Sequence, residues 1–113
     1  MTRRKTRAEM IAALNDAFRR ELVGKGRVYC TAGVNAMGAE FVAKALVKVA
    51  TFDTFTPDND PHREHDFGTF ELDGEKLFWK IDMYDAAGQF GSEDPTDPSK
   101  TLRVLTIMLA EEY

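Results

Sequence analysis

The stretch DFGTFELDGEKLFWKIDMYD, residues 66–85, constrains the fold more than any other part of the chain. Asp73 and Gly74 separate two runs in which apolar and polar residues alternate, as they do in half-buried strands. A two-residue type I′ turn needs positive φ angles at both central positions, and Asp-Gly tolerates them. The stretch therefore predicts a β-hairpin. A two-residue turn also sets the register, in which Gly68 lies opposite Trp79 and leaves room for the indole ring.

This register divides the side chains of the hairpin between two faces. One face is apolar and is predicted to face the core: Phe70, Leu72, Leu77, Trp79, Ile81 and Met83. The other face carries charged residues together with three rings, Phe67, Phe78 and Tyr84. Three rings are more than a face in water usually carries, so we expect a helix or a contact surface to cover them.

A segment at the start of the chain repeats apolar residues with the spacing of an amphipathic helix. Thr6 and Glu9 form a capping box at its start, because each side chain can bond the free backbone N–H of the other residue. Its apolar stripe consists of Ile11, Leu14, Phe18 and Leu22. We expect the opposite face to lie in water, and that face carries Arg7, Asn15, Arg19 and Arg20.

Three further elements complete the predicted fold. A second helix is expected over residues 36–49, and Gly33 separates it from a short strand at residues 27–31. Residues 102–110 favour a buried strand through their β-branched side chains, although their leucines also fit a helical stripe. The core-facing stripe of the second helix consists of Met37, Phe41, Ala45 and Val49. These elements predict an α+β fold, in which two helices pack on a small antiparallel sheet.

The length of the chain, 113 residues, fits one domain, with residues 1–5 as a basic tail. The single cysteine, Cys30, excludes an internal disulfide bond, which fits a reducing compartment. The chain has no apolar run of the about 20 residues that would cross a bilayer. We therefore expect a cytoplasmic protein that does not contact a membrane.

Charge is divided unevenly along the chain. Residues 1–52 carry ten Lys or Arg and four Asp or Glu, whereas residues 53–97 carry three and thirteen. The acids of interest lie in two loops, one with Asp58, Asp60, Glu64 and Asp66 and the other with Glu93, Asp94 and Asp97. We expect these loops to meet at one end of the sheet. The asymmetry favours a partner with a basic surface, although the basic helices can also neutralise the acidic loops within the molecule.

The stretch NDPHREHDFG, residues 59–68, holds both histidines of the chain, His62 and His65. In an extended loop they can converge with Asp60 or Asp66 on a divalent ion, since imidazole and carboxylate groups suit zinc, iron or manganese. The chain lacks the HExxH and paired CxxC signatures of strong metal sites. Asp and Asn side chains in such loops commonly bond their own backbone. We interpret the stretch as a structured acidic loop, and expect no cofactor, metal or catalytic residue there. A metal-dependent enzyme is the alternative.

Several motifs, in order, resemble a known bacterial family, domain of unknown function 3768 (DUF3768). They are NDPHREHDFGTFELDGEKLFWKIDMYD, GSEDPTDPSKT and RVLTIMLAEEY, and the resemblance covers roughly residues 33–113. Met83 stands where the resemblance leads us to expect an aromatic residue. Members of the family look like small proteobacterial proteins that are often encoded near plasmid or other mobile-element genes. The resemblance implies no established activity, cofactor or catalytic residue.

The charge pattern and this implied context favour a small, non-enzymatic interaction protein. We expect its partner to be a protein with a basic surface. One candidate is a nucleic-acid-handling defence protein that the acidic loops inhibit by imitating DNA, as anti-CRISPR and anti-restriction proteins do. The expected binding surface combines the acids of the two loops with Phe67, Phe78 and Tyr84. Direct nucleic-acid binding is a weaker alternative, because the acidic segment opposes phosphate contacts by Arg3, Arg4, Lys5 and Arg7.

Overall fold

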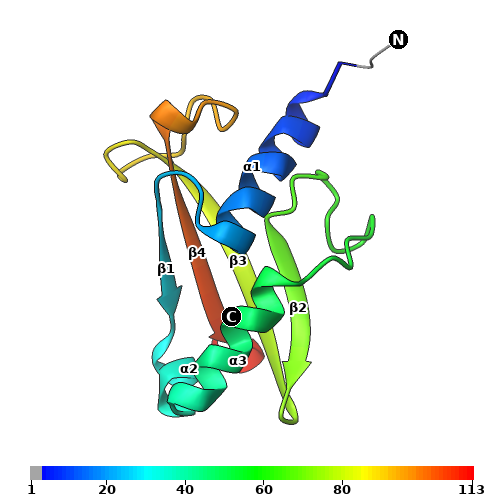
Figure 1. The fold of residues 1–113 in the computed structure, drawn as a ribbon, viewed down its shortest axis with the longest axis vertical. Helices are drawn as coiled ribbons and strands as arrows, with labels where there is room; N and C mark the ends of the chain where they lie inside the picture. Colours follow the sequence, from blue (N-terminus) through cyan, green and yellow to red (C-terminus); the bar gives the residue numbers. More distant parts are fainter. Residues whose placement is uncertain (1–3) are drawn as a thin grey trace.

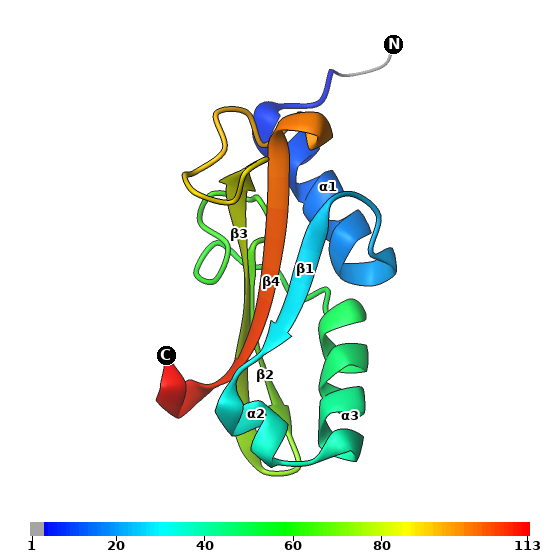
Figure 2. The ribbon, with the colours of Figure 1, turned by 90° about the vertical axis from the view of Figure 1, so that its left-hand side faces the viewer.

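A computed structural model of the chain describes residues 4–113, so most of the basic tail expected at residues 1–5, including Arg3, lies outside the described part. The chain forms a four-stranded sheet in the order β1-β4-β3-β2. Helices α1 and α3 both lie on one face of this sheet (Figure 1, Figure 2). The elements are α1 (Arg7–Glu21), β1 (Gly26–Cys30), α2 (Ala32–Ala36), α3 (Ala39–Ala50), β2 (Phe67–Leu72), β3 (Glu75–Asp85), η1 (Pro98–Lys100), β4 (Thr101–Leu109) and η2 (Ala110–Glu112).

The α+β fold is confirmed, but the sheet is mixed and not entirely antiparallel as predicted. β3 is antiparallel to both β2 and β4, whereas β1 runs parallel to β4, from Gly26 opposite Arg103 to Cys30 opposite Ile107. β4 is a strand and not a helix, as the β-branched residues favoured. The partner of β1 was not predictable because no short turn joins it to a neighbouring strand, and only hairpin turns reveal pairing locally.

The β2–β3 hairpin has the predicted register, with Gly68 opposite Trp79 and Leu72 opposite Glu75. The φ angles of Asp73 and Gly74 are 51° and 82°, as a type I′ turn requires. A Cβ atom on Gly68 would collide with the indole nitrogen of Trp79. The predicted core face is confirmed, because Leu72, Leu77, Trp79 and Ile81 are buried in the main apolar cluster and Phe70 and Met83 pack against it.

The start of α1 agrees with the prediction, whereas the helix predicted over residues 36–49 begins only at Ala39. The capping box of α1 is present, with Glu9 N donating to Thr6 Oγ1 at 3.1 Å and Thr6 N donating to Glu9 Oε1 at 3.4 Å. The short helix α2 was not predicted, and Gly33 lies inside it. Because α2 ends before Met37, this side chain is exposed and does not join the core-facing stripe of α3, which consists of Phe41, Ala45 and Val49.

The expected wet face of α1 is wrong for two of its four residues. Asn15 is 0% exposed and Arg19 is 3% exposed, whereas Leu22, assigned to the apolar stripe, is 62% exposed. Leu22 caps the helix in the left-handed conformation and therefore leaves the helical stripe. Asn15 and Arg19 are buried because the chain between α3 and β2, together with β4, packs on this side of α1 and offers polar partners. Arg7 and Arg20 are exposed as expected.

Candidate functional site

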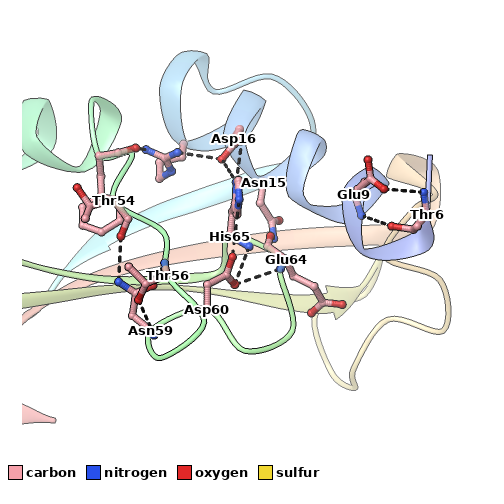
Figure 3. Close-up of polar contacts among 12 residues, drawn as sticks. Thr6, Glu9, Asn15, Asp16, Thr54, Thr56, Asn59, Asp60, Glu64 and His65 are labelled. Atoms are coloured by element: carbon pink, nitrogen blue, oxygen red, sulfur yellow. Dashed lines mark hydrogen bonds and ion pairs between the residues drawn. The ribbon is translucent and has the colours of Figure 1, made fainter. Parts of the chain in front are cut away.

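His65 lies at the centre of a polar cluster between α1 and the loop that leads into β2. Its Nδ1 atom lies 3.0 Å from both carboxylate oxygens of Asp16, and its Nε2 atom lies 3.7 Å from Asp60 Oδ2 (Figure 3). The imidazole stacks on the ring of Phe55, with 3.8 Å between the centroids and 2° between the planes. Asp16 and Phe55 therefore hold the Nδ1 edge and one face of the His65 ring, which gives the ring a single orientation.

Arg19 holds the Asp16 carboxylate that contacts His65. Its Nη2 donates to Asp16 Oδ1 at 2.9 Å, and its Nη1 donates to the backbone oxygens of Val49 at 2.7 Å and Phe52 at 2.8 Å. These two carbonyls belong to the C-terminal end of α3 and the segment that follows it, where helix carbonyls lack partners within the helix. Burial lowers the pKa of Arg19, and the hydrogen bond that Arg19 donates to Asp16 opposes this shift. One guanidinium thus joins α1, α3 and the His65 cluster.

Asp60 organises the loop rather than an exposed surface. It is 4% exposed, and its Oδ1 accepts from the backbone N–H of Glu64 at 3.1 Å and of His65 at 3.2 Å. Arg63 and His65 have φ angles of 59° and 55°, a left-handed conformation that costs free energy in non-glycine residues. The carboxylate of Asp60 offsets that cost, as expected of an acid that bonds its own loop.

A pocket of about 580 Å³ opens beside His65, between the start of α1 and the loop. Its charged lining is mixed, because Lys5 and Arg63 face the acids of this region. The remaining lining combines apolar and hydroxyl groups, and the full set is Lys5, Glu9, Ala12, Ala13, Asp16, Phe55, Thr56, Pro57, Asp60, Arg63 and His65. The arrangement can hold a small polar ligand and can present an oriented imidazole to it.

The two histidines do not form a pair. His62 is exposed, whereas His65 is half-buried and turned toward Asp16. Within residues 4–113, no three His, Cys, Asp or Glu side chains are grouped so that they could hold a metal ion. Asp66, the other acid of the alternative metal set, is half-buried, and burial raises its pKa with a smaller contribution in the same direction from Asp60. The structure thus brings His65 together with Asp16 and Asp60, and not with His62.

A second buried polar contact joins the two acidic loops to one another. Asn15 Nδ2 donates to the backbone oxygen of Glu64 at 2.9 Å, and Asn15 Oδ1 accepts from Arg103 Nε at 2.6 Å. Arg103 Nη2 donates in turn to the backbone oxygen of Pro95 at 2.7 Å. Burial lowers the pKa of Arg103. This pair, which we call the Asn15–Arg103 bridge, anchors the 58–66 loop and the 93–97 loop to the same part of the molecule.

The carboxylates of the second loop make local contacts. Asp94 Oδ1 accepts from the backbone N–H of Thr96, and Asp97 Oδ1 accepts from the N–H of Ser99. The side-chain hydroxyls of Thr96 and Ser99 bond the same oxygens and lower the pKa values of Asp94 and Asp97. These acids shape the loop and leave their other carboxylate oxygens for further contacts. Asp58 and Glu93 are exposed.

Helices α1 and α3 lie on one face of the sheet (Figure 2), and the register places the three rings Phe67, Phe78 and Tyr84 on the other face. Phe67 and Phe78 pack on each other with centroids 5.5 Å apart, and Tyr113 at the end of the chain lies 5.1 Å from Phe78. Tyr84 lies further along β3, opposite Leu102 of β4. Neither α1 nor α3 covers these side chains, which are half-buried.

Sequence reasoning found His65 and Asp60 but missed Asn15, Asp16 and Arg19. The missed residues lie on α1, where Asn15 and Asp16 are each 49 residues from their partners in the loop, and nothing local marks those partners. One weak signal was present, because Asn is a poor helix former whose side chain competes for backbone groups. Its place in the middle of a helix hinted at a tertiary contact.

Within residues 4–113, no helix has the length and apolar character needed to cross a membrane. Neither the curated proteins nor the solved structures contain a match to the chain. The profile of one family, described as "Protein of unknown function (DUF3768)", matches residues 30–112. The match covers most of the chain and contains the loop with His65, the hairpin and β4, so the protein belongs to the DUF3768 family.

Proposed function

We propose that this protein is a non-enzymatic interaction protein whose two acidic loops bind a basic surface on another protein. The observation that carries the proposal is the Asn15–Arg103 bridge, because it fastens the backbones of both loops to one buried pair. Because the two loops are held in this way, they do not move independently, and their negative charges contribute to one electrostatic field. Such a field speeds association with a partner of opposite charge and selects against partners of like charge.

Only part of the acidic set suits this role. Asp60 is buried and bonds its own loop, so it supports the surface without forming it. The exposed carboxylates of Asp58 and Glu93, with the half-exposed Glu64, are the groups proposed to contact the partner. Asp94 and Asp97 add further negative charge in the second loop.

More specifically, we propose that the protein inhibits a nucleic-acid-handling defence protein. Carboxylates on anchored loops can occupy a groove built for phosphates, because both groups are anionic hydrogen-bond acceptors. The segment 53–97, with thirteen acids against three bases, supplies the necessary excess of negative charge. Double-stranded DNA should then compete with the chain for its partner, and a partner that binds both at once would rule out the imitation of DNA.

Two variants with equal net charge test the loop surface. Asp58→Asn/Glu64→Gln/Glu93→Gln removes three charges from the loops, and the control Glu21→Gln/Glu40→Gln/Glu111→Gln removes three from exposed positions elsewhere. Binding would be measured against a partner co-purified from the host, at several salt concentrations. We expect the loop variant to bind about 10-fold more weakly and to lose most of the salt dependence, while the control stays near the parent. Equal binding by both variants would contradict the proposal.

A second candidate function, acid–base catalysis at His65, is favoured by one specific observation. The Nδ1 atom of His65 is held by Asp16, its ring is fixed by Phe55, and the residue lines the pocket, so Nε2 can exchange a proton with a bound ligand. The test is a screen of the purified chain against small phosphate and carboxylate esters. Turnover that is lost in His65→Asn and kept in His62→Asn would support this function, and turnover that survives in His65→Asn would exclude it.

A further inference from the structure

Strand β4 is mostly apolar on both of its faces, with Thr101, Arg103 and Thr106 as the polar exceptions, although α1 and α3 cover only one face. The side chains that point away from the helices are Leu102, Val104, Thr106 and Met108. A strand with one face in water normally alternates apolar and polar residues, whereas a strand that is apolar on both faces is typical of a sheet covered on both sides. The outer face of β4 therefore has the composition of an interior surface.

The neighbouring strands extend this apolar area into what we call the open face. On β3, Phe78 lies opposite Met108 and Tyr84 lies opposite Leu102. On β1, Tyr29 lies opposite Thr106 and is 49% exposed. The open face thus runs across all four strands and consists of Tyr29, Phe67, Phe78, Tyr84, Leu102, Val104, Thr106, Met108 and Tyr113. Met108 is already 6% exposed, and the loop after β3 borders this face at Leu102 and Tyr84.

The end of the chain enlarges the open face and does not close it. Glu112 accepts hydrogen bonds from Thr31 Oγ1 at 2.6 Å and from Gly33 N at 3.0 Å, which fastens η2 against the start of α2. This places Tyr113 against Phe78 on the side of the sheet away from the helices (Figure 2). The ring of Tyr113 remains exposed, so it adds apolar area at one end only.

We propose that the open face packs against the same face of a second copy of the chain, forming a symmetric dimer. The area of the open face is suited to a second copy of the chain. The four strands have 5, 6, 11 and 9 residues, and at about 3.4 Å per residue and about 4.8 Å between strands they give a flat area of roughly 500 Å². The accessible area of a surface with side chains exceeds its flat projection, and a stable interface needs about 800 Å² from each partner.

The charges of the open face also favour a second copy over other occupants. Lys80 and Asp82, which point outward from β3, already form an ion pair of 2.7 Å with each other. The remaining outward charges nearly balance, with Arg27 and Lys76 against Glu71. A nucleic acid would need a clear excess of cations and a basic protein an excess of acids. A nearly neutral apolar face matches an identical face, as the self-complementary interface of a twofold dimer requires.

Sedimentation velocity of the full chain, from about 1 to about 200 µM, tests the proposal over the range in which an interface of this size commonly assembles. We expect the mass to rise from that of one chain to that of two. Val104→Glu, at the centre of the open face, should remain a single chain at the highest concentration. Its control is Val47→Glu on the outer side of α3, a site 62% exposed, which should assemble like the parent.

Tyr29→Glu gives an independent measurement in case Val104→Glu fails to fold, because Tyr29 is half-exposed at the edge of the sheet. We expect this variant to weaken assembly at least about 10-fold while keeping the parent's circular dichroism spectrum. A parent chain that stays monomeric at every concentration would overturn the proposal, even if it binds oligothymidylate or another protein through this face. Assembly that survives in Val104→Glu and Tyr29→Glu but is lost in Val47→Glu would overturn it too.

Discussion

The β2–β3 hairpin and the polar face of α1 are held together by interactions of very different range. In the hairpin, the turn residues Asp73 and Gly74 are adjacent, and all backbone partners lie within 13 residues of each other. On α1, by contrast, Asn15 bonds Glu64 and Arg103, which lie 49 and 88 residues away. The hairpin is specified by local backbone conformation, whereas the polar face of α1 is specified by groups that meet only after the chain has folded.

This difference predicts different sensitivity to substitution. A turn residue in the wrong conformation costs backbone strain at one position and leaves no buried group without a partner. A buried polar side chain that is removed leaves several desolvated partners, and each costs free energy. The polar face of α1 should therefore be the more fragile of the two regions, although it looks like an ordinary wet face in the sequence.

The largest effect is expected at Arg19, compared with its neighbour Arg20. Arg19→Ala leaves the Asp16 carboxylate and the carbonyls of Val49 and Phe52 without their donor. We expect a loss of about 3–5 kcal/mol in the free energy of unfolding, measured by urea denaturation. Arg20→Ala, at an exposed position, should change it by less than about 0.5 kcal/mol. Equal effects at both arginines would mean that this face of α1 is exposed to solvent and not buried.

Asn15→Leu should have the next largest effect. Leucine has a similar volume but cannot pair with the backbone oxygen of Glu64 or with Arg103 Nε. We expect a loss of about 2–3 kcal/mol in the free energy of unfolding. Hydrogen exchange of the backbone amides around Glu64 should become faster in this variant, while that in the β2–β3 turn stays unchanged. Faster exchange in both places would show that the two regions are not independent.

Gly74→Val tests the hairpin side of the comparison. No atom lies near the position that a Cβ would take, so the substitution adds backbone strain without a collision. A β-branched residue resists the φ of 82° found there, and we expect a loss of about 1–2 kcal/mol. Asp73→Asn, which suits the same turn, is the control and should melt with the parent. A Gly74→Val variant that also melts with the parent would contradict the type I′ turn.

The smallest effect is expected at Asp66, where the loop enters the hairpin. Burial raises the pKa of Asp66, so the folded chain holds this proton more tightly than the unfolded chain. The ionised carboxylate therefore destabilises the fold above its folded pKa, and this penalty disappears as the pH falls below the unfolded value of about 3.9. Asp66→Asn should be slightly more stable than the parent at pH 7, by less than about 1 kcal/mol, and equal to it near pH 3. A constant difference across this range would exclude the titration of Asp66 as its cause.

The same contrast explains which parts of the structure were predictable from the sequence. The hairpin, its core face, the capping box of α1 and the strand character of β4 follow from local turn chemistry and periodicity, and all are confirmed. The parallel pairing of β1 and the burial of Asn15 and Arg19 depend on distant partners, so periodicity alone assigned the polar residues to water. His65 was recognised as a candidate, but its true neighbours, Asp16 and Phe55, were not. The binding role of the acidic loops remains a prediction.

A double-mutant cycle between Asn15 and Arg103 tests the central claim most directly, because the two side chains meet at 2.6 Å across 88 residues of sequence. The free energies of unfolding would be measured for Asn15→Leu, Arg103→Met and the double variant, with Arg20→Ala and Arg103→Met as the control cycle. We expect the Asn15–Arg103 cycle to show a coupling of about 1–2 kcal/mol and the control cycle to be additive within about 0.5 kcal/mol. Additive effects in both cycles would contradict the buried bridge, and with it the anchoring of the two acidic loops on which the proposed function rests.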